Sequence, residues 1–176
     1  MEPLPLRTMK ALFLGRFQPF HNGHLQVIKE CVPRFQHLFI GIGSSQYEHT
    51  LENPFTVEER RQMIEKALEE DITFYEVFAI PDIHNYPRWV AHVEQFVPPF
   101  DVVVANNDLT LQLFREKGYE LYQPKIYSRE VYCGREIRRR MINDEPWSDL
   151  VPGAVYRYLL ELQASQRLKK LDVVSP

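Results

Sequence analysis

Short apolar runs alternate along the chain with segments that have helical spacing. The runs are KALFLG (10–15), HLFIGIG (37–43), FYEVFAI (74–80), FDVVVA (100–105) and a shorter ELY (120–122). Between the first two runs, Leu25, Ile28 and Cys31 recur at the spacing of a helix that Pro33 should end or kink. Strands that alternate with helices predict a parallel sheet with right-handed crossovers, a Rossmann-like α/β fold flanked by helices.

The remaining helices are predicted from capping residues and periodicity. Thr56 followed by Glu59 is a capping-box pattern, and Gly118 is placed to end a helix. The expected helices cover residues 57–70, 88–97, 109–118, 135–144 and one final stretch of about 152–168.

Length and composition narrow the class of protein. A chain of 176 residues fits one domain, expected at 10–168 with a flexible leader at 1–9 and a tail at 169–176. A net charge of −3 provides no general basic field, so any anion must be recognised locally. Cys31 and Cys133 are too few for a disulfide framework, and no signal peptide or membrane span is evident. We therefore expect a soluble cytoplasmic protein.

Polar, irregular segments follow the predicted strands. They begin after Gly15, Gly43, Ile80 and Ala105, and they read RFQPFHNGH, SSQYEHTLENPF, PDIHNYPRW and NND. Because ligands bind beyond the carboxyl ends of parallel strands, these loops should converge on one active site.

The segment HNGH places His21 and His24 three residues apart, after Arg16. One interpretation is a phosphate site, with imidazoles and helix-terminal amides facing the anion and Gly23 allowing close approach. A plain turn with capping histidines explains the pattern equally well, and a metal site is weaker because further ligands are missing.

The segment CGREIRRR begins a predicted helix at Gly134 and places Arg135, Arg138 and Arg139 in its first turns. Cations at a helix N-terminus oppose the helix dipole, which favours a bound phosphate there. A solvated basic face with acidic neighbours Glu136 and Asp144 is the alternative.

Two further loops carry candidate ligand contacts. In PDIHNYPRW, Trp89 could stack on a flat ring near Asp82 and Asn85, or could be the first core residue of a helix. In NND, Asn107 or Asp108 could cap a helix, which fully accounts for this segment.

Together these stretches resemble a known family. GRFQPFHNGH is similar to the first motif of the HxGH nucleotidyltransferase superfamily, and CGREIRRRM to its second motif. The intervening IGIGSSQYEHTLENPFTVEER, IPDI and VPPFDVVVANN resemble the archaeal-type nicotinamide-nucleotide adenylyltransferases. The resemblance runs from about Lys10 to about Leu168.

The resemblance implies a reaction in which nicotinamide mononucleotide (NMN) attacks the α-phosphorus of ATP directly, giving NAD and pyrophosphate. Catalysis then falls to His21, His24, Arg16 and Arg138. The implied ATP contacts are Gly15, Arg16, Phe17, His21, Gly23, His24, Asn107, Cys133, Gly134, Arg135 and Arg138. The implied NMN contacts are Asp82, Ile83, Asn85 and Trp89.

The same resemblance implies Mg²⁺ that arrives with ATP and is held largely by phosphates and water, and a homo-oligomer, often a hexamer. Alternatives are a sister enzyme acting on pantetheine phosphate, FMN or a polyol phosphate, and a nucleotide-binding regulator without catalysis. Cys133 and Arg135 depart from the serine and threonine usual in the second motif, and Asn106 from a usual glycine. We expect Arg135 to contact the β- or γ-phosphate.

Overall fold

The computed structural model describes residues 8–68, 72, 74–125 and 130–175. The chain divides into two compact units, each assembled from three separate stretches. We call residues 1–15, 27–44 and 72–125 the sheet unit, and residues 16–26, 45–71 and 126–176 the helical unit. Among the described helices, none is long and apolar enough to cross a membrane.

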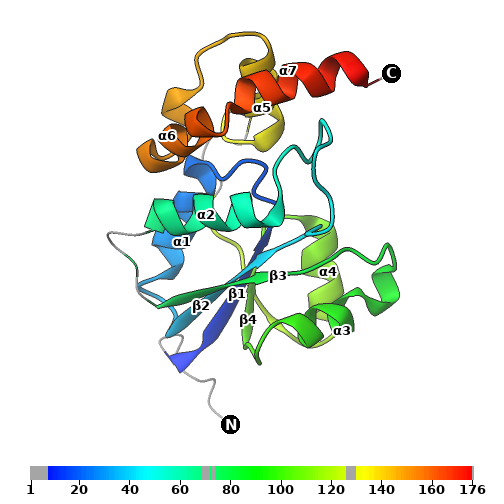
Figure 1. The fold of residues 1–176 in the computed structure, drawn as a ribbon. Helices are drawn as coiled ribbons and strands as arrows, with labels where there is room; N and C mark the ends of the chain where they lie inside the picture. Colours follow the sequence, from blue (N-terminus) through cyan, green and yellow to red (C-terminus); the bar gives the residue numbers. More distant parts are fainter. Residues whose placement is uncertain (1–7, 69–71, 73, 126–129, 176) are drawn as a thin grey trace. The chain divides into compact units, whose positions relative to one another are not determined.

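The sheet unit contains five parallel strands, which confirms the predicted Rossmann-like fold (Figure 1). In sequence order they are β1 (Lys10–Gly15), β2 (His37–Ile42), β3 (Tyr75–Ala79), β4 (Val102–Val104) and β5 (Glu120–Tyr122). Their order in the sheet is β3-β2-β1-β4-β5, so the order reverses beside β1, where such sheets bind ligands.

Helices α3 (Tyr86–Phe96) and α4 (Asp108–Glu116) belong to the sheet unit. The side chain of Asn85 accepts a hydrogen bond from the backbone of Arg88, so α3 begins two residues earlier than predicted. Gly118 follows α4 with a φ of 85°, which confirms the predicted glycine beyond this helix. Helix α1 (Asn22–Cys31) begins in the helical unit and ends in the sheet unit, before Pro33 as expected.

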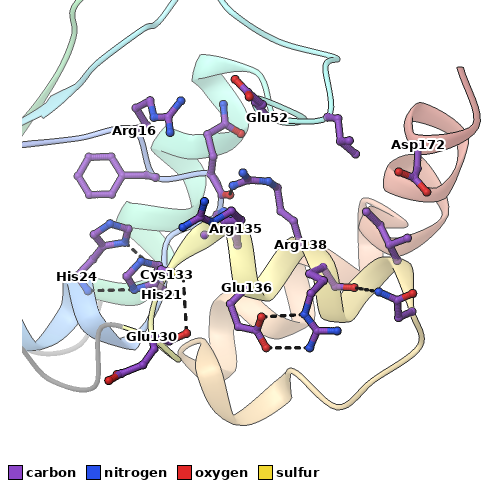
Figure 2. A pocket seen from close by; sticks show the side chains of 18 residues that line it. Arg16, His21, His24, Glu52, Glu130, Cys133, Arg135, Glu136, Arg138 and Asp172 are labelled. Atoms are coloured by element: carbon purple, nitrogen blue, oxygen red, sulfur yellow. Dashed lines mark hydrogen bonds and ion pairs between the residues drawn. The ribbon is translucent and has the colours of Figure 1, made fainter. Parts of the chain in front are cut away.

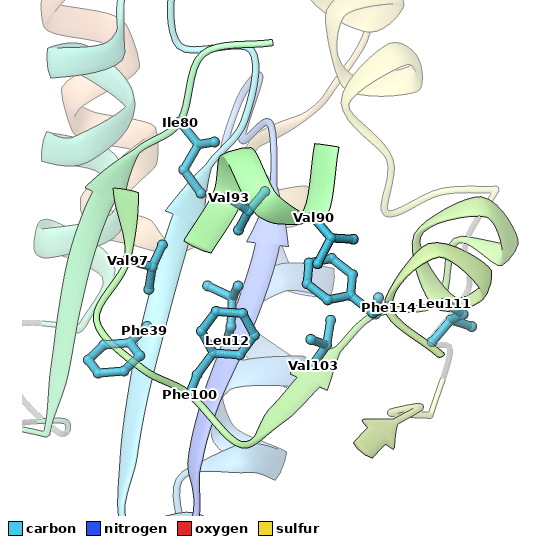
Figure 3. Packing of buried hydrophobic residues seen from close by; sticks show 11 residues of the cluster. Leu12, Phe39, Ile80, Val90, Val93, Val97, Phe100, Val103, Leu111 and Phe114 are labelled. Atoms are coloured by element: carbon cyan, nitrogen blue, oxygen red, sulfur yellow. The ribbon is translucent and has the colours of Figure 1, made fainter. Parts of the chain in front are cut away.

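A cluster of buried apolar residues forms the described core of the sheet unit (Figure 3). Leu12, Phe39 and Val103 project from the strands and pack with α3 and α4 residues such as Val93 and Phe114. Leu12, Val93, Val103 and Phe114 are completely buried. Buried apolar surface is therefore the main stabilising contribution in this unit.

The helical unit contains α2 (Val57–Leu68), α5 (Gly134–Ile142), the 3₁₀ helix η2 (Ser148–Leu150), α6 (Gly153–Glu161) and α7 (Ala164–Val174). The predicted capping box is confirmed, because the Thr56 backbone donates to the Glu59 carboxylate at 2.9 Å and the Glu59 backbone to the Thr56 hydroxyl at 3.1 Å. The predicted end of this helix, Glu70, lies outside the described residues.

The prediction of one final helix over about 152–168 is wrong. Gln163 adopts a left-handed conformation with a φ of 52° and separates α6 from α7. The two helices have different partners, since α6 packs against α2 and α7 against α5, and one straight helix would not serve both. Helix α7 continues to Val174 through most of the segment expected as a tail.

Candidate active site

His21 and His24 form a stacked pair whose hydrogen bonds are reciprocal. Their ring centroids are 3.6 Å apart. The backbone N–H of His21 donates to Nδ1 of His24 at 3.2 Å, and the backbone N–H of His24 donates to Nδ1 of His21 at 3.4 Å. Because both Nδ1 atoms accept, each neutral ring carries its proton on Nε2.

Burial keeps both imidazoles neutral. Desolvation lowers the pKa of His21 to about 4. Burial lowers the pKa of His24 well below its usual value of 6.5, and repulsion from His21, when that ring is protonated, adds to this effect. Near neutral pH the pair therefore presents two uncharged Nε2–H donors.

Gln18 fixes the loop that precedes this pair. Its side-chain amide donates to the Phe55 carbonyl and accepts from the Phe55 backbone, both at 3.0 Å. The neighbouring Phe17 is buried at a φ of 55°, and its ring meets the His24 ring edge-on at 4.7 Å. The carbonyl of Gln18 also accepts a 2.6 Å hydrogen bond from Nη1 of Arg138. This bond joins the loop from Arg16 to His24, which we call the histidine loop, to α5.

Gly134, the first residue of α5, has no space for a side chain. A Cβ atom there would lie 2.8 Å from the Gln18 carbonyl oxygen and 2.9 Å from Nη1 of Arg138. Burial lowers the pKa of Arg138 to about 10, and the nearby charge of Arg16 contributes. Cys133 occupies the N-cap position without a side-chain capping bond, and its Sγ lies 4.0 Å from the Glu130 carbonyl.

The arginines of α5 divide into two groups. Arg139 and Arg140 pair with Glu136 at 2.8 Å, and Arg139 also pairs with Glu145 at 2.6 Å. For these two arginines the solvated, charge-paired interpretation is correct, although the second predicted acidic neighbour, Asp144, instead pairs with Lys169. Arg135 has no hydrogen bond or ion pair within the part of the chain that the structure describes.

The histidines, Arg16 and the α5 arginines other than Arg140 line one cavity of about 1290 Å³, which lies within the helical unit (Figure 2). Figure 2 shows the histidine pair on one side of the cavity and the side chains of α5 on another. Of the residues predicted to contact ATP, the lining contains Arg16, Phe17, His21, His24, Cys133, Gly134, Arg135 and Arg138. The structure therefore brings the two sequence motifs together.

Three residues of the predicted ATP set do not line this cavity. A Cβ at Gly23 would lie 2.9 Å from Cε1 of His21, so this glycine leaves the space that the His21 ring occupies. Gly15 and Asn107 belong to the sheet unit, where Asn107 caps α4 by accepting from the backbone of Thr110.

Known proteins are similar in sequence to this chain over nearly its whole length. A family model described as cytidylyltransferase-like matches residues 12–148. A nicotinamide-nucleotide adenylyltransferase of Methanococcus aeolicus is 47% identical over 165 residues, covering 94% of this chain and 96% of the relative. Proteins of the same name from Archaeoglobus fulgidus and Thermococcus sibiricus are 44% and 43% identical to this chain. Both alignments cover 93% of this chain, and they cover 98% and 89% of the respective relatives.

This chain belongs to the nicotinamide-nucleotide adenylyltransferase family. Identity of this extent over more than nine tenths of both chains decides the assignment, and the two motifs that carried the resemblance are the ones that line the cavity. The member described here is accordingly a nucleotidyltransferase, an enzyme.

Solved structures agree on the fold of this adenylyltransferase. Two crystal structures of a bifunctional NMN adenylyltransferase/ADP ribose pyrophosphatase from Francisella tularensis match with TM-scores of 0.78 and 0.79 at 23% identity. The first was complexed with AMP and a manganese ion. Our chain is covered to 93% but spans only 52% of those proteins.

The residues predicted to bind NMN lie in the sheet unit of the adenylyltransferase, around the start of α3. Oδ1 of Asp82 accepts from the backbone of His84 at 2.9 Å, and Asn85 caps α3. The half-buried indole of Trp89 meets Phe114 edge-on at 5.6 Å, and Ile83 is 37% exposed. Trp89 thus packs on the core, as the simpler interpretation predicted, while retaining some accessible surface.

Sequence reasoning missed several residues of the adenylyltransferase site. Gln18 bonds to a residue 37 positions away, and Glu52 and Asp172 line the cavity from other segments. Arg60 is completely buried, and it falls in register with the buried Met63 and Ile64 on the apolar face of α2. That spacing was visible in the sequence, because an arginine on an apolar stripe is unusual.

Proposed function

We propose that this enzyme transfers AMP from ATP to nicotinamide mononucleotide, giving NAD and pyrophosphate. An oxygen of the NMN 5′-phosphate forms a bond to the α-phosphorus of ATP. The bond from that phosphorus to the bridging oxygen breaks, and pyrophosphate leaves with the electron pair. The family assignment supports this reaction, and the observation that carries it is the cavity lined by both motifs.

The composition of the cavity suits direct transfer of this kind. Phosphoryl and nucleotidyl transfers need positioned donors and positive charge more than a protein nucleophile. Arg16, Arg135 and Arg138 supply charge for the triphosphate and for the leaving pyrophosphate. The Nε2–H groups of His21 and His24 supply donors for oxygens on the α-phosphate, where charge shifts during the reaction.

A divalent cation, which we propose is Mg²⁺, fits this site as a companion of the substrate. The described residues include no group of three His, Cys, Asp or Glu side chains able to hold a metal ion. Phosphate oxygens and water are the ligands that Mg²⁺ uses at most nucleotide sites. When bound to the triphosphate, the ion would neutralise charge on the leaving group, while the arginines grip the oxygens that it leaves free.

For the acceptor, we propose that Asp82, Ile83, Asn85 and Trp89 contact NMN. The indole of Trp89 is only half-buried against Phe114, which leaves surface on which a pyridine ring could stack. Asp82 and Asn85 already bond within their own loop, and such bonds would hold the loop in place for the ligand. We also propose a cytoplasmic homo-oligomer, on family resemblance.

A panel of acceptors tests the proposed function. Purified enzyme, ATP or CTP and Mg²⁺ are combined with NMN, nicotinic acid mononucleotide, pantetheine phosphate, FMN or a polyol phosphate, and pyrophosphate release is measured. We expect the highest kcat/KM with ATP and NMN. Better turnover of a non-pyridine acceptor would identify a sister enzyme, and ATP binding without turnover of any acceptor would identify a regulator.

A further inference from the structure

Arg60 is a fully buried cation close to the triphosphate cavity. Its side chain is 0% exposed, and it is the largest of the completely buried side chains in the described chain. It lies in the first turn of α2, on the same face as Met63 and Ile64. An apolar residue would satisfy that face at a lower desolvation cost, so a guanidinium there calls for a reason.

The guanidinium of Arg60 joins three segments of the helical unit through backbone carbonyls. Nη1 donates to the carbonyl of Arg16 at 3.1 Å, and Nη2 donates to the carbonyls of Ser45 and Tyr47 at 3.3 Å. Nε donates to the carbonyl of Thr56, which directly precedes α2, at 3.2 Å. The planar fork of arginine is suited to hold several acceptors in a fixed arrangement.

The segments joined in this way form the cavity. Arg16 begins the histidine loop, and Ser45 and Tyr47 begin the loop that carries Leu51 and Glu52 into the cavity wall. Arg60 therefore helps to hold the backbone of Arg16 and anchors the loop that begins at Ser45.

The charge of Arg60 also acts on its neighbours. Burial lowers the pKa of Arg60 to about 10, and the next largest contribution is repulsion from Arg16. Arg138 experiences the same repulsion from Arg16. Clustered positive charges of this kind repel one another, and an anion that binds among them offsets this repulsion.

We infer that Arg60 is a positioning residue of the triphosphate site, which sets the backbone of Arg16 and adds a buried positive charge behind it. The inference rests on the proposed function, because it takes the anion in the cavity to be the triphosphate of ATP or the pyrophosphate product. Arg60 is not expected to touch the substrate.

Two substitutions separate the roles of charge and geometry. Arg60→Met removes the charge at similar length, and Arg60→Lys keeps the charge but cannot reach all four carbonyls. We expect Arg60→Met to raise the KM for ATP and the Kd for pyrophosphate by about tenfold or more. Arg60→Lys should give a smaller increase, and the KM for NMN should change less than about twofold in either variant.

The KM distinguishes positioning from a purely structural role. Partial unfolding lowers the active fraction and hence kcat, but it leaves the KM of the remaining folded enzyme unchanged. The matched control is Arg61→Met, the next residue of α2, whose side chain lies 3.8 Å from Glu58 and is 31% exposed. It should retain the wild-type KM for ATP.

A wild-type KM for ATP in Arg60→Met overturns the inference, whatever happens to kcat. If Arg60→Met does not fold, Arg60→Lys decides, and a wild-type KM for ATP and Kd for pyrophosphate in that variant overturn it equally. If neither variant folds, Arg60 is a structural residue and the inference fails. Failure of the wild-type enzyme in the acceptor panel is a separate result and would overturn the proposed function itself.

Discussion

The sheet unit and the helical unit bury different kinds of side chain. The described core of the sheet unit is a continuous apolar cluster of aliphatic and aromatic residues. The four buried polar or charged side chains found among the described residues, Gln18, His21, Asn53 and Arg60, all belong to the helical unit. Both units also bury apolar residues, so the difference between them lies in the polar and charged side chains that are buried.

This difference separates stability from chemistry. Burying a polar group costs free energy unless its hydrogen bonds are replaced, and most of these groups are bonded to the loops that shape the cavity. The sheet unit contains none of these four side chains and provides the stable framework. Substitutions in the two units should therefore change different measured quantities.

The largest expected effect on stability lies in the sheet unit. Phe114→Ala removes a completely buried ring that packs on Trp89, Phe100 and Tyr119. We expect a loss of about 3–5 kcal/mol in the free energy of unfolding, with little change in the KM for ATP. Urea denaturation measures the loss. Leu109→Ala in the same helix, 40% exposed, should cost less than about 0.5 kcal/mol, and equal losses in both variants would contradict the comparison.

The largest expected effect on activity lies in the helical unit. His24→Ala removes an Nε2–H donor and the acceptor for the His21 backbone, so kcat/KM should fall about 10²–10³-fold. Steady-state pyrophosphate release measures the fall, and circular dichroism checks that the protein is folded. His37→Ala, a histidine of the sheet unit that pairs with Glu76, is the control and should retain activity. A near-full rate in His24→Ala would refute its role.

Acid should weaken the helical unit through its buried histidines. The pKa of His21 is about 4 in the folded protein against 6.5 in the unfolded chain, so the unfolded chain binds this proton first. The free energy of unfolding should therefore fall as pH decreases from 6.5 towards 4, and His21 accounts for up to roughly 3 kcal/mol of this loss. Above pH 6.5, titration of His21 should not change the free energy of unfolding. Denaturation across this pH range tests it, since His21→Gln should flatten the dependence. An unaltered slope in that variant would show that other groups are responsible.

The smallest expected effect concerns the arginine that departs from the usual motif. Arg135 is exposed beside the cavity, so Arg135→Thr should raise the KM for ATP only about two- to fivefold and reduce the salt dependence of ATP binding. Arg140→Thr, which instead disrupts the pair with Glu136, should leave both quantities unchanged. If Arg135→Thr leaves them unchanged as well, this residue does not contact the triphosphate.

Local patterns predicted most of the sheet unit and part of the helical unit. The strands, the reciprocal capping of Thr56 and Glu59 and the glycine after α4 all follow from spacing and residue type over a few positions. The residues of both motifs were likewise visible, because each motif is contiguous in the sequence. The structure adds that Arg16 and Arg138 line the same cavity.

The parts that could not be predicted depend on distant partners. Arg60 donates to a carbonyl 44 positions earlier, and Arg138 to one 120 positions earlier. Contacts between residues so far apart in the sequence cannot be inferred from the residues next to either partner. The break at Gln163 has the same origin, because it depends on which helices α6 and α7 pack against. Which α5 arginines pair with glutamates and which line the cavity, with Arg139 doing both, likewise required three-dimensional coordinates.

The interleaving of the two units along the chain limits how this enzyme can be altered. The chain passes from one unit to the other after residues 15, 26, 44, 71 and 125. Neither unit can therefore be produced as a continuous fragment, and exchanging any segment longer than residues 72–125 with a homologue replaces parts of both. We expect recombinants between distant relatives to fold poorly unless their crossovers fall at these five positions, so new specificity is more easily obtained by point substitution than by exchange of segments.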